Sequence, residues 1–174
     1  MERVPGARIG EFDGSAYLDD LFGDSGSFLT AVAKWAAKAG VDALDLYSIL
    51  VHEARGLDNS WFWPDSFMER NFTIGKYNDT HGPSNLGWWE FDSAMDRGNL
   101  DHLIPARLTR RAAWNRLSRS EYLEIAVAAT AYNLQERIDD AAAFIGSDRS
   151  DYTADAYAVM MYRTGLQGME NDYP

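Results

Sequence analysis

The chain has 174 residues, 46% of them hydrophobic and 13% aromatic, and a formal net charge of −11 at pH 7. A chain of this length and composition is typical of one globular domain that buries about two-thirds of its unfolded surface, which excludes a disordered protein. The acidic balance argues against a nucleic-acid partner, because a phosphate backbone requires a basic surface. The sequence contains no cysteine, so we expect no disulfide framework.

Targeting signals are not evident in the sequence. No apolar run reaches the roughly 18 residues that a membrane span needs, so no span is expected. The first residues, MERVPGARIGEFDGS, lack the apolar segment of a Sec signal. Cellular location and protein partners therefore stay open. Residues 1–24, which are rich in glycine and aspartate, are predicted to form an N-terminal arm, and residues 25–174 the folded domain.

Two helices are predicted near the start of this domain. Apolar residues at steps of three and four extend from Ser27 to Gly40, where the glycine can end the helix. A second helix begins at Asp42, a residue type that caps helix N-termini, and ends at Gly56. Turn-forming residues then predict a long loop over 57–87.

The remainder of the chain is also predicted to be mainly helical. Ser118 and Glu121 form a capping box before the strongest helical pattern, whereas Pro105 breaks or begins a weaker one. Helices are expected at 92–97, 100–117, 118–146 and 151–165, and a short hairpin near 72–74 and 88–91. The fold class is therefore mainly α, with a long loop or small hairpin that forms one wall of a cleft.

Glu53 is the first candidate for catalysis. It is predicted to lie in the last turn of the second helix, where the helix dipole disfavours negative charge, and apolar neighbours would disfavour that charge further. A carboxyl group that keeps its proton near neutral pH can act as a general acid on a glycosidic oxygen. The alternative is a solvated surface residue beside Arg55.

Aromatic residues are dense in the loop that follows Glu53. Because sugar rings pack their C–H faces on indoles, a glycan cleft would use such a loop, although core packing remains an alternative for most of the rings. The nine aromatic residues are Trp61, Phe62, Trp63, Phe67, Phe72, Tyr77, Trp88, Trp89 and Phe91.

Acidic residues lie among these rings. Inverting glycosidases need a second carboxylate that holds water, roughly 6.5–9.5 Å from the general acid. Asp65, Asp79, Glu90 and Asp92 are the candidates on the loop. Asp79 is equally typical of a turn, and Asp92 of a helix N-cap.

A metal site is the rival interpretation of this region. His52, His81 and His102 have acidic neighbours, but the HEARG segment lacks the second histidine of an HExxH motif. The three histidines also lack the spacing of metal ligands. The sequence contains no nucleophile elbow, P-loop or dinucleotide fingerprint, so we expect no metal and no cofactor.

Four segments in order resemble the lysozyme-like superfamily, most closely the goose-type lysozymes and lytic transglycosylases. LYSILVHEARG resembles the helix that ends in the catalytic glutamate, and SNLGWWEF is similar to the Gly-Leu-Met-Gln segment. ATAYNLQ resembles the Ala-Tyr-Asn-Ala-Gly segment, and SDYTADAYAVMMYRTG the closing helix. Together the segments cover roughly residues 44–165.

The resemblance implies a fold, an activity and a set of site residues. It implies a helical glycosidase that cleaves β-1,4 bonds of peptidoglycan, with Glu53 as the general acid and Asp79 and Asp92 positioning water. It also implies a sugar groove lined by Trp88, Trp89, Glu90, Tyr132 and Asn133, to which the aromatic loop adds Trp61 and Trp63. Such a substrate implies action outside the cell, in the periplasm, or by delivery from a phage or secretion apparatus.

The departures from the family pattern leave alternatives open. After Gly87, which matches the family glycine, Leu-Met-Gln is replaced by Trp88-Trp89-Glu90, and the Ala-Gly after Tyr-Asn is replaced by Leu134-Gln135. One alternative is a chitosanase or chitinase of the same superfamily, since a cationic polymer would suit an acidic protein. The other is a glycan-binding or structural protein that descends from this fold without catalysis.

Overall fold

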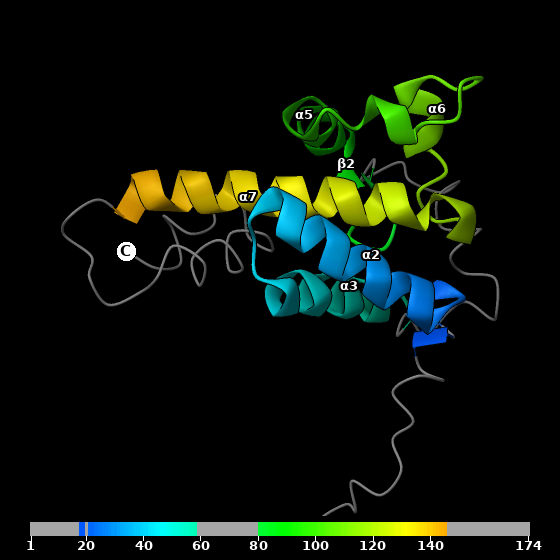
Figure 1. Ribbon diagram of the computed structural model, residues 1–174, viewed down its shortest axis with the longest axis horizontal. Coiled ribbons are helices and arrows are strands. Elements are labelled where there is room, and N and C mark those ends of the chain that lie inside the picture. The colour runs from blue at the N-terminus through cyan, green and yellow to red at the C-terminus, as the bar shows by residue number, and fades with distance from the viewer. Residues whose placement is uncertain (1–17, 20, 59–79, 146–174) are drawn as a thin grey trace, which may run out of the picture.

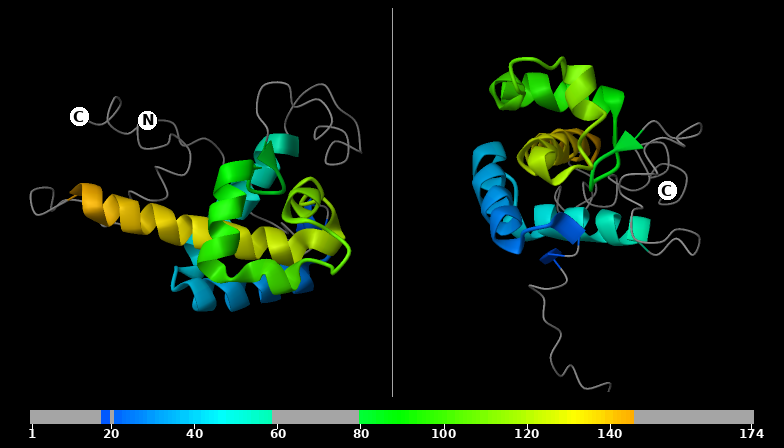
Figure 2. Two further views of the ribbon diagram at one scale, coloured as in Figure 1. Left: turned by 90° about the horizontal axis from the view of Figure 1, so that it is seen from above. Right: turned by 90° about the vertical axis from the view of Figure 1, so that its right-hand side faces the viewer.

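The longest helix, α7 (Leu123–Ile145), runs through the centre of the computed structural model, which describes residues 18–19, 21–58 and 80–145 (Figure 1). Two helices, α2 (Ser25–Ala39) and α3 (Ala43–Asp58), lie on one side of α7, and α5 (Trp88–Gly98) with α6 (Arg110–Trp114) lies on the other (Figure 2). The described part of the chain is therefore mainly α, as predicted.

Short elements connect these helices. Two 3-10 turns, η2 (Leu100–Leu103) and η3 (Ser120–Tyr122), flank α6. Strands β1 (Thr80–His81) and β2 (Leu86–Gly87) form an antiparallel hairpin in which Thr80 pairs with Gly87 and His81 with Leu86.

Most of the first half of α7 is buried, and most of its buried side chains are small. Seven side chains of residues 123–134 have no exposed surface: Ala126, Val127, Ala128, Ala129, Thr130, Ala131 and Leu134. Because alanine extends little beyond the backbone, helices on both sides can approach α7 closely. The same holds at Gly98 of α5, where an added Cβ would lie 2.6 Å from the ring of Tyr132. The core thus forms around α7 and takes a layer of helices on either side.

Two predicted helix caps are confirmed, Gly40 at the end of α2 and Asp42 at the start of α3. The N-cap of α2 is Asp24, which was not predicted as a cap and which accepts hydrogen bonds from the N–H groups of Gly26 and Ser27. Gly40 ends α2 with a left-handed φ of 71°. Asp42 accepts from the N–H groups of Leu44 and Asp45 at 2.7 and 3.1 Å, as expected of an N-cap. These bonds satisfy backbone donors that the first helical turn leaves unpaired.

Several predicted boundaries are wrong. α3 continues through Gly56 to Asp58, so Glu53 lies five residues before its end and not in the last turn. Trp88–Phe91 begins α5 and is not a strand, and Asp92 lies inside that helix and is not its N-cap. The hairpin forms at residues 80–87. The predicted strand near 72–74 and the predicted helix at 151–165 lie outside the described residues.

The later helices also differ from the prediction. The segment 100–117 divides into η2, an irregular stretch around Pro105, and the short α6. α7 begins at Leu123 directly after η3, and Arg119, not Ser118, occupies the capping position before that turn.

The packed region begins before the expected boundary at residue 24. Leu18 and Phe22 are each 5% exposed, and the ring of Phe22 stacks on Phe28 with centroids 3.9 Å apart. Both side chains belong to the core, so the residues just before α2 are part of the domain and not of an arm. Residues 1–17 lie outside the described chain. None of the described helices is long and apolar enough to cross a membrane.

The close approach at Gly82 generates a test of the fold. Gly82 has a φ of 82°, and an added Cβ would lie 2.8 Å from the Cβ of Leu117. We expect Gly82→Ala to lower the free energy of unfolding by about 3 kcal/mol, since it adds backbone strain and a steric clash. Gly40→Ala is the matched control, because Gly40 has a φ of 71° but no atom within 4 Å of the added Cβ. Its cost should be about 1–2 kcal/mol in urea unfolding. Equal losses would contradict the packing of Leu117 on the hairpin.

Candidate active site

The turn of the hairpin contacts three helices at once. Asn85 donates from Nδ2 to Oε2 of Glu53 on α3, at 3.1 Å. Ser84 and Thr130 of α7 are joined through their hydroxyl oxygens at 2.6 Å. The main-chain oxygen of Leu86 accepts a hydrogen bond from Nε1 of Trp114 on α6, at 2.9 Å. Three consecutive residues therefore fix the relative positions of α3, α7 and α6.

The direction of the Ser84–Thr130 bond follows from the second bond of Thr130. Thr130 Oγ1 donates its one proton to the carbonyl of Ala126, at 2.8 Å. Ser84 must therefore donate to Thr130, since a hydroxyl group has only one proton. Both residues are at least 98% buried, so each hydroxyl would be costly to leave unpaired. The hairpin turn can occupy this place only with Ser84 facing α7.

Glu53 is half-buried on the side of α3 that faces the hairpin turn. Its Oε2 is occupied by the Asn85 amide, and among the described residues Oε1 has no hydrogen-bond partner. Because the amide N–H needs an acceptor, Oε2 carries no proton in this geometry, and Oε1 is the oxygen that can hold one. The preceding residue, His52, is exposed. The site thus offers one carboxyl group with one bound and one available oxygen.

Asn85 was not among the predicted site residues. It adopts a left-handed conformation with a φ of 53°, and its N–H donates to the carbonyl of Gly82 at 3.1 Å. Asparagine tolerates this conformation better than most residues, so its place in the GPSN turn was a usable signal. The partner of its side chain could not be read from spacing, because Glu53 lies 32 residues away.

Asp92 lies on the face of α5 that points away from α7, where Arg110 binds it. Arg110 Nη1 donates to Asp92 at 3.1 Å and to Asp96 at 2.6 Å, and Arg110 also binds both oxygens of Asp101 at 2.6 and 2.7 Å. No contact among the described residues joins Asp92 to Glu53. The structure therefore places Asp92 in an ion-pair cluster that ties α5 and η2 to α6.

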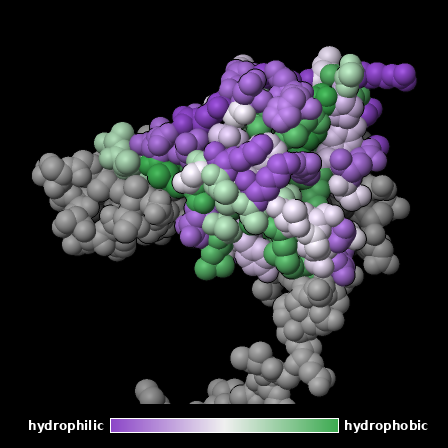
Figure 3. Space-filling model, viewed as in Figure 1, coloured by the Kyte–Doolittle hydropathy of each residue, from purple (hydrophilic) through white to green (hydrophobic). Residues whose placement is uncertain are grey.

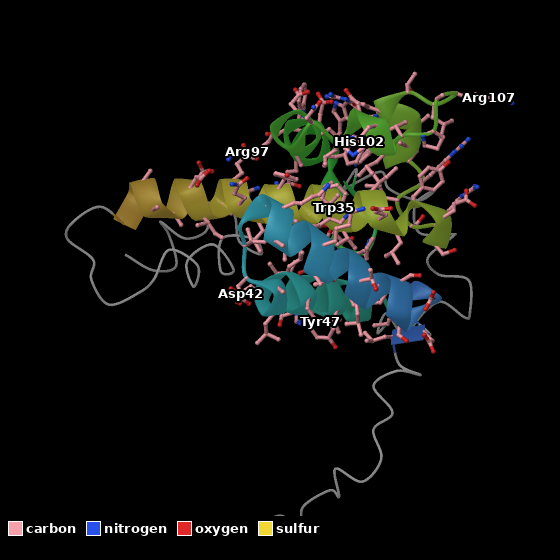
Figure 4. All side chains as sticks on the ribbon, in the orientation of Figure 1. Trp35, Asp42, Tyr47, Arg97, His102 and Arg107 are labelled. Atoms are coloured by element: carbon pink, nitrogen blue, oxygen red, sulfur yellow. The ribbon has the colours of Figure 1, made fainter. Side chains whose placement is uncertain are left out.

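Glu90 is engaged in helix capping and in an ion pair. Its Oε2 accepts from the N–H of Gly87 at 2.8 Å, across the first turn of α5. Its Oε1 accepts from Nη2 of Arg137 on α7 at 2.7 Å. On the same face of α5, Ser93 donates to Glu136 and Arg97 pairs with Asp139. This polar row fastens α5 to α7, and Figure 4 labels Arg97 at this contact.

The aromatic residues of the predicted groove have different environments. Trp88 is half-buried and meets Trp114 edge-on, with ring centroids 5.8 Å apart. Trp89 is 81% exposed and is the largest apolar side chain that the described surface presents. Tyr132 is half-buried against α5, and Asn133 is only 2% exposed. Asp79, Trp61 and Trp63 lie outside the described residues.

No known protein family, curated protein or solved structure matches this chain. The candidate site therefore depends on its own geometry and chemistry. In the part of the chain that the structure describes, no group of three histidine, aspartate or glutamate residues could hold a metal ion.

An open hollow of about 630 Å³ lies apart from these residues. It is lined by the first half of α2 on one side and by η3 and the start of α7 on the other. Its walls include Ser27, Lys34, Glu121 and Glu124 and contain no aromatic ring. Lys34 and Glu124 form an ion pair there, and this hydrogen bond lowers the pKa of Glu124. Because none of the candidate site residues lines this hollow, we assign it no part in the candidate site.

The Arg110 cluster predicts a pH dependence of stability. The hydrogen bond from Arg110 lowers the pKa of Asp101 below its ordinary value of 3.8. A carboxyl group whose pKa is lowered by folding stabilises the fold above its unfolded pKa and loses that contribution as the pH falls through the folded pKa. We expect the contribution to be present at pH 5 and to decline below about pH 4.

The variant Arg110→Gln removes the guanidinium that lowers the pKa of Asp101, so it should lack this contribution to stability. Its free energy of unfolding should be lower than that of the parent chain at pH 6, and the two should converge toward pH 2. Urea unfolding followed by circular dichroism across this range measures both curves. Arg107→Gln, an exposed arginine three residues away, is the matched control and should follow the parent. A constant difference between parent and Arg110→Gln at all pH values would contradict the role of the Arg110 cluster.

Proposed function

We propose that this protein cleaves β-1,4-glycosidic bonds of peptidoglycan, in the manner of a muramidase or lytic transglycosylase, with Glu53 as the general acid. The proposal draws on the resemblance of four segments to the lysozyme-like superfamily. Its main support is the bond between Asn85 and Glu53, which aligns the one carboxyl group of the candidate site through a turn that is itself fixed in the core.

The chemistry begins with the proton on Glu53. With Oε2 bound to Asn85, the proton on Oε1 would be transferred to the bridging oxygen as the glycosidic bond breaks and an oxocarbenium-like state forms. Trp89, as an exposed indole at the start of α5, would pack on a sugar ring near the bond. Trp88 supports the same end of α5 from its partly buried position against Trp114.

The fate of the oxocarbenium-like state depends on a second group. A carboxylate that holds water leads to hydrolysis with inversion. Asp65 and Asp79, which lie outside the described residues, are the remaining candidates on the loop, because Glu90 is bound by Arg137 and Asp92 by Arg110. If no such base is present, the N-acetyl and 6-hydroxyl groups of the substrate would give the 1,6-anhydro product of a transglycosylase.

A non-catalytic glycan-binding protein is the second candidate. The ion pairs of Glu90 and Asp92 favour this candidate. Glu90 was expected to line the sugar groove and Asp92 to position water, but both side chains instead hold α5 to its neighbours. The two candidates differ in their dependence on the proton of Glu53. Only an enzyme requires that proton for turnover.

The variant Glu53→Gln separates the candidates. The amide cannot act as a general acid, so release of soluble fragments from dye-labelled peptidoglycan should fall at least about 100-fold. Binding of the protein to insoluble peptidoglycan, measured by co-sedimentation, should stay unchanged. The matched control is Glu121→Gln, an exposed carboxylate on η3 that should keep full activity. Activity that survives in Glu53→Gln, or that is missing from the parent chain, would contradict the proposal.

Asn85 supplies a further test, as a positioning residue for Glu53. Asn85→Gly keeps the left-handed backbone at low cost but removes the amide, so kcat should fall about tenfold while KM changes little. Asn99→Gly is the matched control. Asn99 is the other described asparagine with a positive φ, 49°, and it lies at the end of α5 without contact to Glu53. Equal effects of the two changes on kcat would exclude a positioning role for Asn85.

A further inference from the structure

The connection between η2 and η3 is strongly basic in an otherwise acidic chain. Residues 105–119 contain five arginines and no aspartate or glutamate, although the whole chain carries a net charge of −11. They include α6 and lie at one end of the molecule, beside α5 (Figures 1 and 2). The net charge of the protein therefore conceals a chain segment of the opposite sign.

Two of these arginines already have polar partners. Arg110 is bound by the three aspartates described above, and Arg116 donates to the hydroxyl of Tyr122 at 3.2 Å. Arg107, Arg111 and Arg119 are exposed, and none of them forms an ion pair with a described carboxylate. Figure 4 shows Arg107 extending away from the molecule, and Figure 3 shows hydrophilic side chains over this end. We call these three residues the basic surface.

Arg111 is the fixed member of the basic surface. Its guanidinium carbon lies 4.7 Å from the ring centre of Trp88 and 4.2 Å from that of Trp114. Trp114 is 1% exposed and is anchored by its hydrogen bond to Leu86. Stacking engages the flat faces of a guanidinium and leaves its N–H edge free, so Arg111 presents donors that are already oriented. A ligand that binds them loses less conformational entropy than one that must order a mobile side chain.

We propose that the basic surface binds a short acidic peptide segment of a partner protein. Carboxylates match the paired N–H groups of arginine in charge and in geometry. Arginine and tryptophan are also the residue types that contribute most to protein–protein contacts. A short peptide contacts only this surface, whereas a long polyanion would also meet the acidic remainder of the protein, which repels it. The inference does not depend on the proposed glycosidase activity.

A binding titration tests this proposal. Fluorescence anisotropy would follow a labelled peptide of alternating glutamate and glycine, about ten residues long, during titration with the full chain at low salt. The control peptide has glutamine in place of glutamate. The proposal expects saturable binding of the glutamate peptide, no binding of the glutamine peptide, and weakening as salt is added.

Variants locate the binding site. The double variant Arg107→Glu, Arg119→Glu changes two exposed side chains without described partners and should weaken binding at least about tenfold. Arg111→Lys keeps the charge but loses the guanidinium that stacks on the indoles, and should weaken it several-fold. The matched control, Lys38→Glu, reverses one exposed charge on α2, across α7 from α6, and should leave affinity near that of the parent chain. Circular dichroism confirms that each variant is folded.

Five outcomes would overturn the proposal. The first four are a lack of binding up to millimolar peptide, equal binding of both peptides, equal loss in Lys38→Glu and in the double variant, and tighter binding of an oligothymidylate of the same charge. The fourth outcome would assign the basic surface to single-stranded nucleic acid. Self-association that the double variant abolishes, seen by analytical ultracentrifugation without peptide, would assign the surface to a second copy of this chain and would equally overturn the proposal.

Discussion

The hydrogen bond between Ser84 and Thr130 is the constraint that places the rest of the candidate site. Both hydroxyl groups are buried in a mainly apolar core, where leaving either one unpaired would cost about 1–3 kcal/mol. The hairpin turn must therefore direct Ser84 at α7. Once Ser84 is fixed, chain geometry directs the amide of Asn85 to Glu53 and the carbonyl of Leu86 to Trp114. A single buried polar pair thus sets the register between the helix that carries Glu53 and the helices on the other side of α7.

The charged residues of α5 explain why so many acids surround the tryptophans. The face of Glu90 and Arg97 is paired with α7, and the face of Asp92 and Asp96 is paired with Arg110. The apolar side chains between these two faces, which are Phe91, Ala94 and Met95, have no exposed surface. The acids of this helix therefore stabilise its position, and Trp89 is left on its solvent side. Because Glu90 and Asp92 are held in these ion pairs, we propose Glu53 as the carboxyl group that takes part in catalysis.

Local signals in the sequence were sufficient for the end of α2, the N-cap of α3 and the mainly helical class, because Gly40 and Asp42 act on backbone groups within a few residues. They were insufficient for α5. Its N-cap residue, Gly87, has no side-chain oxygen, so the capping hydrogen bond is made by the carboxylate of Glu90 inside the helix. In addition, two adjacent tryptophans are typical of a strand. The partners of Asp92 and Glu53 could not be predicted, since Arg110 and Asn85 come from segments 18 and 32 residues away. The net charge of −11 for the whole chain likewise gave no indication of the basic surface.

Mass spectrometry of peptidoglycan fragments after incubation with the purified protein tests whether Glu53 has the role proposed for it. We expect soluble disaccharide-containing fragments whose new ends are either reducing muramic acid or its 1,6-anhydro form, and we expect both to be missing with Glu53→Gln. A reducing end would indicate water held by a second group, and an anhydro end would indicate attack by the substrate itself. Intact glycan strands after incubation with the folded parent chain would rule out this role of Glu53.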